Sequence, residues 1–195
     1  MYEVVTMPQE RRGPLTTDDA ILVEAARRHT SAFEPLYGRY RDRIYAYMRL
    51  RTRSAEDAAD LTQQAFLQAL GALPQYRVQR GTFAAWLFRI AHNVATDDAR
   101  RRRVTISWDL VPEALQPLAG DDTEAAVLHT EALDRLRCVL DACPSPTREM
   151  LALRFTAGLT SAEIAVVVGK SEAAVKKQLT RIIQTVKEQY HEHPR

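Results

Sequence analysis

The sequence has few residues that interrupt helices, few cysteines and no long apolar run. Only 7 of its 195 residues are glycine and 9 are proline, a composition that favours helices. No apolar stretch approaches the roughly 20 residues that span a bilayer. Residues 1–14 also lack the apolar core of a signal peptide. The sequence therefore predicts a helical, cytoplasmic protein that makes no membrane contact of its own.

The cysteines and histidines do not form a metal-binding pattern. Cys138 and Cys143 lie five positions apart rather than in C-x-x-C spacing, and His29, His92 and His129 are scattered. The sequence contains no Gly-rich phosphate loop and no nucleophile elbow. We therefore predict buried or half-buried thiols, no metal, no cofactor and no enzymatic activity.

Apolar residues recur at steps of three and four along much of the chain, which is the spacing of a helix. The strand pattern of alternating apolar and polar residues is hard to find anywhere. The clearest helical runs are Phe33, Leu36, Tyr37, Tyr40, Ile44, Tyr47 and Met48; Leu61, Ala65, Phe66, Ala69 and Leu70; and Phe83, Leu87, Ile90 and Val94. Together with a short helix near residues 17–28, they predict an all-α domain over residues 16–103.

A stretch of different composition follows this domain. Residues 104–125 contain no Lys or Arg but five acidic residues, and Pro112, Pro117 and Gly120 break any long helix. We interpret this stretch as an acidic flexible linker. A second small helical domain is predicted over residues 126–190. The helices expected beyond the linker cover residues 123–142, 147–155, 160–168 and 172–189.

The strongest local signal is a pair of short helices near the carboxy terminus. Thr160 and Glu163 have the T-x-x-E spacing of a capping box, which starts a helix. Gly169 allows the left-handed backbone that ends it, and Ser171 suits the start of the next helix. Two short helices joined by a tight turn are the arrangement that presents the second helix to a DNA major groove.

The second helix of this pair has one apolar and one basic face. The apolar face steps by four, three and four through Val175, Leu179, Ile182 and Val186. The basic face contains Lys170, Lys176, Lys177, Arg181 and Lys187. These cations can neutralise phosphates, and side chains near the helix start can reach base edges. An ordinary helical hairpin with a solvated basic face is the alternative interpretation.

The helix predicted over residues 82–103 also combines an apolar stripe with a polar one. Its polar stripe consists of Arg89, Asn93, Thr96, Asp97 and Arg100. The helix ends in four consecutive arginines, 100–103, which suit the helix dipole and also suit a phosphate-binding site. The preceding loop contains Tyr76, Arg77 and Arg80, and such a loop can hold an unstacked base.

Both halves of the chain resemble the extracytoplasmic-function (ECF) sigma factors of the sigma-70 family. Residues 60–70 (DLTQQAFLQAL) and 83–93 (FAAWLFRIAHN) are similar to domain two of these proteins. The stretches similar to domain four are 148–154 (REMLALR), 158–165 (GLTSAEIA) and 169–176 (GKSEAAVK). The resemblance implies a sigma factor that binds core RNA polymerase and directs promoter-specific initiation of transcription. It also implies an anti-sigma protein that binds this sigma factor and inhibits it.

The resemblance also implies a role for three groups of residues. The polymerase β′ subunit would be bound by Asp60, Gln63, Gln64, Phe66 and Leu67. The minus-ten promoter element would be bound by Arg77, Arg80, Asn93, Thr96, Asp97, Arg100 and Arg101, with one flipped base held by the loop 75–82. The minus-thirty-five element would be read by Ser171, Glu172, Ala173, Lys176, Lys177, Thr180 and Arg181.

The polymerase β subunit is expected to contact domain four at an apolar surface that includes Leu151 and Phe155. The acidic linker would thread toward the polymerase active-site cleft. Two positions depart from the family pattern. Ala173 and Ala174 stand where the family often has Gly-Thr. His92 stands where the family often has an arginine or another polar residue, and it is predicted to be partly buried.

A stand-alone helix-turn-helix regulator is the alternative function. In that case residues 1–103 would sense a ligand or mediate dimerisation, and the protein would bind its DNA site without polymerase.

Overall fold

The chain is helical throughout its described secondary structure. The computed structural model describes residues 16–52, 54–77, 81–102, 139 and 142–192. No strand occurs within these ranges, in agreement with the predicted all-α fold. In chain order the elements are α1 (Thr16–Arg28), η1 (Thr30–Phe33), α2 (Glu34–Arg49), α3 (Ala55–Ala72), η2 (Leu73–Gln75), α4 (Phe83–Arg102), α6 (Ser145–Leu151), η5 (Ala152–Thr156), α7 (Ser161–Val168) and α8 (Glu172–Glu192).

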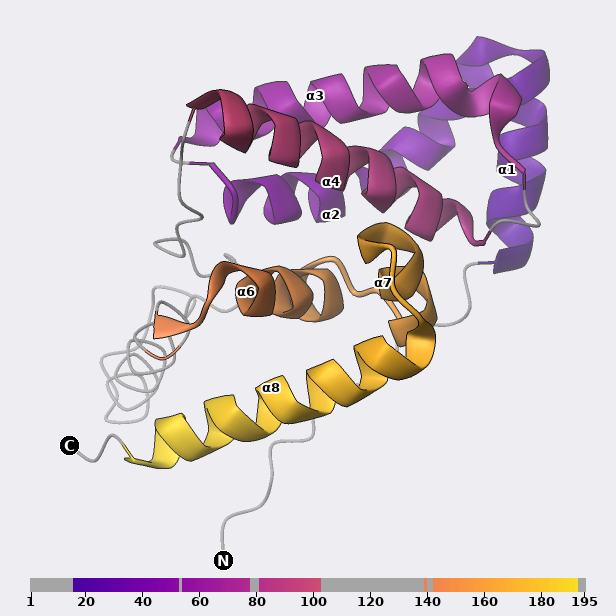
Figure 1. The fold of residues 1–195 in the computed structure, drawn as a ribbon. Helices are drawn as coiled ribbons and strands as arrows, with labels where there is room; N and C mark the ends of the chain where they lie inside the picture. The colour runs from indigo at the N-terminus through magenta and orange to yellow at the C-terminus, as the bar shows by residue number, and fades with distance from the viewer. Residues whose placement is uncertain (1–15, 53, 78–80, 103–138, 140–141, 193–195) are drawn as a thin grey trace, which may run out of the picture.

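Helices α1 to α4 form an amino-terminal bundle (Figure 1). The predicted apolar face of α2 is buried there, through Leu36, Tyr40, Ile44, Tyr47 and Met48. The Tyr40 hydroxyl donates to the buried carboxylate of Asp19 in α1, and this carboxylate also lies 2.6 Å from Arg39. Burial raises the pKa of Tyr40, so this phenol remains a donor and ties α1 to α2.

Helices α6, α7 and α8 form the carboxy-terminal unit. Helix α6 begins at Ser145, two residues before the predicted start, because Pro146 fits the first turn of a helix. The chain continues as a π-helical turn, η5, rather than as the regular helix predicted to residue 155. The predicted linker 104–125 and most of the predicted helix 123–142 lie outside the described residues.

The two units pack directly against each other. Helix α7 lies against α4, and η5 lies against α2 (Figure 1). Buried apolar side chains of both units belong to one core cluster, which includes Leu87 and Phe88 of α4 as well as Leu153 and Leu159. The sequence predicted two helical domains, but no pattern in it indicated this contact.

Candidate nucleic-acid interface

Helices α7 and α8 form a helix-turn-helix through the predicted local signals. The Thr160 hydroxyl accepts a hydrogen bond from the Glu163 amide at 3.2 Å, and the Glu163 carboxylate accepts one from the Thr160 amide at 2.8 Å. Gly169 ends α7 with a φ of 68°, in the left-handed region. Ser171 starts α8 by accepting a hydrogen bond from the Ala174 amide at 3.2 Å. The predicted capping box, glycine turn and helix start are confirmed.

Helix α8 is fixed by its apolar face and free on the opposite face. Val175, Leu179 and Ile182 are buried against the rest of the unit. All the residues predicted to read the minus-thirty-five element are exposed, namely Ser171, Glu172, Ala173, Lys176, Lys177, Thr180 and Arg181. The buried stripe therefore sets the rotation of α8 about its axis, and this rotation turns the predicted recognition residues to solvent.

The polar contacts on the exposed face of α8 are weak and local. The Lys176 ammonium lies 2.7 Å from the Glu172 carboxylate, and both side chains are about half exposed or more. The Lys170 ammonium donates to Gln178 at 2.9 Å. Exposed ion pairs of this kind contribute about 0–1 kcal/mol. Lys176 can therefore exchange its carboxylate partner for a phosphate with little loss.

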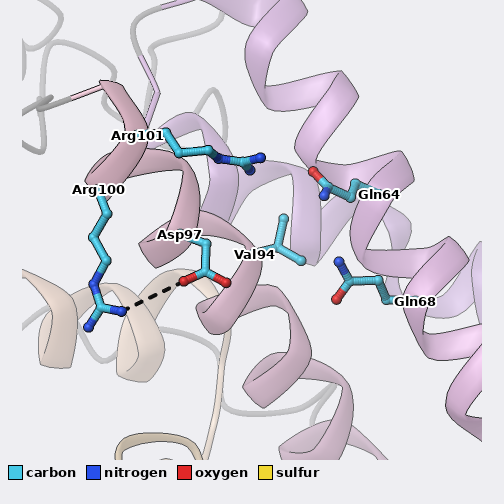
Figure 2. A pocket seen from close by; sticks show the side chains of 6 residues that line it. All are labelled: Gln64, Gln68, Val94, Asp97, Arg100 and Arg101. Atoms are coloured by element: carbon cyan, nitrogen blue, oxygen red, sulfur yellow. Dashed lines mark ion pairs between the residues drawn. The ribbon is translucent and has the colours of Figure 1, made fainter.

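An open hollow of about 400 Å³ lies between α3 and α4 (Figure 2). It is lined by Gln64, Gln68, Val94, Asp97, Arg100 and Arg101. Figure 2 shows the two glutamines on α3 facing the α4 residues, with Arg101 extended toward Gln64. The Arg100 guanidinium lies 3.9 Å from the Asp97 carboxylate.

This hollow brings together residues that the sequence assigned to two separate groups. Gln64 comes from the predicted polymerase-binding set, and Asp97, Arg100 and Arg101 come from the predicted minus-ten set. Gln68 and Val94 were not among the predicted site residues. Helical spacing could have indicated both residues, because Gln68 lies one helical turn after Gln64 and Val94 lies one turn before Asp97.

The other residues of the minus-ten set are placed differently. Asn93 is exposed, whereas Thr96 is half-buried and its hydroxyl accepts a hydrogen bond from Arg51 at 3.4 Å. Arg77 is exposed and donates to the Pro74 carbonyl at 3.1 Å. Arg80 lies outside the described residues.

Tyr76 is buried rather than available for stacking on a base. Its ring packs against Phe83 and Trp86, with ring centroids 5.8 and 5.0 Å away. Its hydroxyl donates to the Gly81 carbonyl at 3.2 Å. Tyr76 therefore ties the two ends of the 76–81 loop together, which differs from the base-stacking role that its sequence position suggested.

Most of the predicted polymerase-binding residues lie at least partly exposed on one face of α3, and one of them, Phe66, is buried. Asp60, Gln63 and Leu67 are exposed, and Leu67 keeps 62% of its surface accessible. Gln64 is half-buried. Phe66 is only 5% exposed, and its ring packs 4.7 Å from that of Tyr37. The burial of Phe66 favours a role in supporting this face over direct contact with a partner.

Two further predictions concern α6 and its surroundings. Phe155 is 57% exposed, whereas Leu151 is buried in the core, so of these two predicted contact residues Phe155 alone offers its side chain to a partner. Cys143 is buried, as predicted, and its thiol donates to the Val139 carbonyl at 3.3 Å. Burial raises the pKa of this thiol. Cys138 lies outside the described residues.

Comparison with known proteins agrees with this geometry. The sigma-70 region 2 family matches residues 36–105, and the sigma-70 region 4 family matches residues 133–186. The ECF RNA polymerase sigma factor BldN of Streptomyces coelicolor is 31% identical over 184 residues, covering 90% of this chain and 68% of BldN. This chain belongs to the ECF sigma factors of the sigma-70 family.

Other ECF sigma factors match over both units. SigD of Mycobacterium tuberculosis is 31% identical over 179 residues, covering 88% of this chain and 82% of SigD. The structure of CnrH in complex with the cytosolic domain of CnrY superimposes with a TM-score of 0.65 at 25% identity, covering 90% of this chain and 99% of CnrH. Because these likenesses span both units, they favour a transcription initiation factor over a stand-alone helix-turn-helix regulator.

None of the described helices has both the length and the apolar character that a membrane span requires.

Proposed function

We propose that this ECF sigma factor binds core RNA polymerase and directs it to promoters with defined minus-ten and minus-thirty-five elements, catalysing no reaction itself. Its domain two would comprise residues 16–103 and its domain four residues 126–190, joined by the acidic linker 104–125. The observation that carries the proposal is the geometry of α8. A buried stripe fixes this helix in a helix-turn-helix, and the whole predicted recognition face is exposed.

At the minus-thirty-five element, α8 offers cations for phosphates and small side chains for base edges. Lys176, Lys177 and Arg181 would neutralise backbone charge. Ser171 and Glu172, at the start of the helix, would reach hydrogen-bonding groups in the major groove. Ala173 carries no hydroxyl, and its methyl group suits contact with a thymine methyl.

At the minus-ten element, the hollow between α3 and α4 offers two amides and two guanidiniums to a single strand. Amide side chains bond to base edges, while Arg100 and Arg101 attract phosphates and stack on bases. The open form of the hollow suits a strand lying across it. We assign Asp97, Arg100 and Arg101 to this contact, with Gln68 added, and we assign Arg77, Arg80, Asn93 and Thr96 to the same promoter element outside the hollow.

Polymerase would be bound at two apolar side chains in polar surroundings. Leu67 projects from α3 beside Asp60 and Gln63, and we assign this face to the β′ subunit. Phe155 projects from η5, and we assign it to the β subunit. Exposed apolar side chains rimmed by polar ones are typical centres of protein interfaces.

We also propose an anti-sigma protein as a partner, a cytoplasmic location and no cofactor. The anti-sigma assignment rests on membership of the ECF family. It is supported by CnrH, a chain of the same architecture, which is held in complex with the cytosolic domain of CnrY.

The test is run-off transcription with purified core polymerase on a library of promoter sequences. We expect specific transcripts only when this chain is added, from templates that share two elements. A gel shift with the chain alone provides the discriminating control. Tight, specific binding of promoter DNA without polymerase, together with no effect on transcription, would identify a stand-alone regulator and refute the proposal.

A further inference from the structure

Two arginines from different elements converge on one backbone oxygen of the amino-terminal bundle. The Arg27 guanidinium of α1 donates to the Pro74 carbonyl of η2 at 3.3 Å. The Arg77 guanidinium donates to the same carbonyl at 3.1 Å. A carbonyl oxygen has two lone pairs and can accept both bonds. The two donating nitrogens are therefore no further apart than the sum of these two distances. We refer to Arg27 and Arg77 as the arginine pair.

Packing around the arginine pair fixes the backbone that carries it. Figure 1 shows α1 beside the connection between α3 and α4, and α1 contacts both η2 and α4. Pro74 lies in the first turn of η2, where its ring restricts the backbone. The buried ring of Tyr76, which precedes Arg77, packs against Phe83 and Trp86 of α4. Arg27 thus reaches the arginine pair only because α1 packs at this end of the bundle.

The arginine pair carries more positive charge than its neighbours neutralise. The Glu24 carboxylate lies 3.5 Å from Arg27, but it also lies 3.2 Å from Arg28. One carboxylate thus serves two guanidiniums, and the carbonyl that the arginine pair shares has no net charge. Two like charges this close repel each other, and an anion placed between them relieves the repulsion.

The exposure and the shape of these side chains suit a phosphate. Arg27 and Glu24 are 36% and 54% exposed, so a phosphate can displace this carboxylate at little cost. Arg77 is exposed as well. A guanidinium presents several N–H donors in a planar fork, and this fork matches the oxygens of a phosphate. Two such groups from α1 and from the segment after η2 can bind one phosphate together.

The position of the arginine pair indicates which phosphate it would bind. Tyr76, beside Arg77, packs at the start of α4, whereas Asp97 and Arg101 line the hollow near the end of this helix. A helix rises about 1.5 Å per residue, so the two places are roughly 20 Å apart along α4. About six nucleotides span this distance at the duplex rise of about 3.4 Å per nucleotide. A strand held in the hollow is therefore long enough to reach the arginine pair within one short promoter element.

We propose that Arg27 of α1 joins Arg77 to bind one backbone phosphate of the single strand at the minus-ten element. This inference rests on the proposed function and adds a DNA contact from α1, which had no proposed role. The contact fixes the position of the strand and carries no sequence information, because every nucleotide has the same phosphate. Glu24 competes with this phosphate for Arg27.

The first test measures the affinity of the polymerase holoenzyme for one promoter fragment over a range of salt concentrations. R27Q removes the charge and keeps an amide that can donate to the Pro74 carbonyl. We expect R27Q to weaken binding about fivefold and to reduce the slope of log affinity against log salt by about 0.7, the value for one phosphate of a single strand. R28Q is the matched control, because Arg28 pairs with Glu24 rather than with Pro74. It should bind within about twofold of the unaltered chain.

Two further variants separate the loss of charge from damage to the fold. R27K keeps the charge and should keep the salt dependence. E24Q removes the competing carboxylate and should strengthen binding about twofold, a gain that a damaged fold cannot produce. If E24Q weakens binding instead, Glu24 supports Arg27 rather than competing for it, and the proposed site is overturned.

The second test locates the phosphate. A neutral methylphosphonate replaces one phosphate at a time along each strand of the promoter fragment. We expect one position within the minus-ten element where this replacement weakens binding of the unaltered holoenzyme about fivefold and that of R27Q no further, since the contact is already lost. If R27Q loses the same affinity at every position, it contacts no phosphate. If the coupled position lies outside the minus-ten element, the assignment to this element is wrong.

The outcomes separate this site from the proposed function. If core polymerase gains no promoter affinity from the unaltered chain, the proposed function fails and the site fails with it. If promoter affinity is gained but R27Q matches R28Q in affinity and in salt slope, the phosphate site alone is overturned. If R27Q changes the preferred promoter sequence and leaves the salt slope unchanged, Arg27 supports the segment around Pro74 and does not bind a phosphate.

Discussion

Two ion pairs between a glutamate and a basic residue, Glu172–Lys176 on α8 and Glu149–Arg51 between the units, lie in opposite surroundings. Glu172 and Lys176 are 48% and 64% exposed, whereas Glu149 and Arg51 are 11% and 8% exposed. Water screens the first pair, which contributes about 0–1 kcal/mol. Removing one partner of a buried pair costs about 3–5 kcal/mol. Burial thus separates the charges that are available to a ligand from the charges that set the arrangement of the units.

The largest expected effect is the loss of the buried carboxylate. E149A should lower the free energy of unfolding by about 3 kcal/mol, because it leaves the Arg51 guanidinium buried without its anion. Urea unfolding followed by circular dichroism measures this change. The control E172A removes the exposed partner and should cost less than about 1 kcal/mol. If E149A and E172A lower the free energy of unfolding equally, the buried pair does not stabilise the fold more than the exposed pair.

Substitutions on the exposed face of α8 should weaken DNA binding and leave the free energy of unfolding nearly unchanged. K176E/R181E should weaken binding to the minus-thirty-five element at least about tenfold, because two phosphate contacts become repulsive. The free energy of unfolding should stay within about 0.5 kcal/mol of the unaltered value. Transcription from promoters with and without this element measures the effect, with R28E on α1, an exposed site outside every proposed set, as the charge control. An equal loss of affinity for core polymerase would contradict the assignment of α8.

Substitutions on the face of α3 that contains Asp60 should weaken polymerase binding and have little effect on binding to the minus-thirty-five element. D60A/Q64A should weaken association with core polymerase about tenfold, equivalent to about 1.4 kcal/mol. Competition with a labelled sigma factor for core polymerase measures this affinity. E56Q, on the same helix but outside the proposed set, is the control. If D60A/Q64A competes as well as E56Q, this face of α3 does not bind polymerase.

The smallest expected effect is a pH dependence of stability at His92. Its folded pKa of about 4 lies below the ordinary 6.5. The unfolded chain therefore binds more protons between these values, and stability present above pH 6.5 is lost as the pH falls toward 4. The groups facing the ring are Tyr47, Arg51 and Glu149. Lowering the pH from 7 to 5.5 should cost about 1 kcal/mol more in the unaltered chain than in H92Q. If the free energy of unfolding changes equally with pH in the unaltered chain and in H92Q, His92 does not contribute to this pH dependence.

Local features of the fold were predictable because neighbouring residues carry them. The capping box of Thr160 and Glu163, the turn at Gly169 and the start of α8 at Ser171 each depend on residues within four positions. The apolar face of α2 followed from spacing alone. The π-helical turn after α6 carried no such signal, and the burial of Tyr76 depends on the rings of Phe83 and Trp86 in α4.

The sequence by itself determined the helices, their apolar faces, the helix-turn-helix and the resemblance to ECF sigma factors, since all of these depend on short-range spacing and recognisable strings. Only the tertiary structure decided which charges are buried. Arg51 and Glu149 look like ordinary surface residues in the sequence, His92 was predicted to be partly buried but was given no partner, and Glu163 looks like a helix cap and nothing more. The contacts that they make join residues 57 to 102 positions apart, because α4 packs against α7 and α2 packs against η5. Contacts between residues so distant along the chain leave no periodic pattern from which they could be predicted.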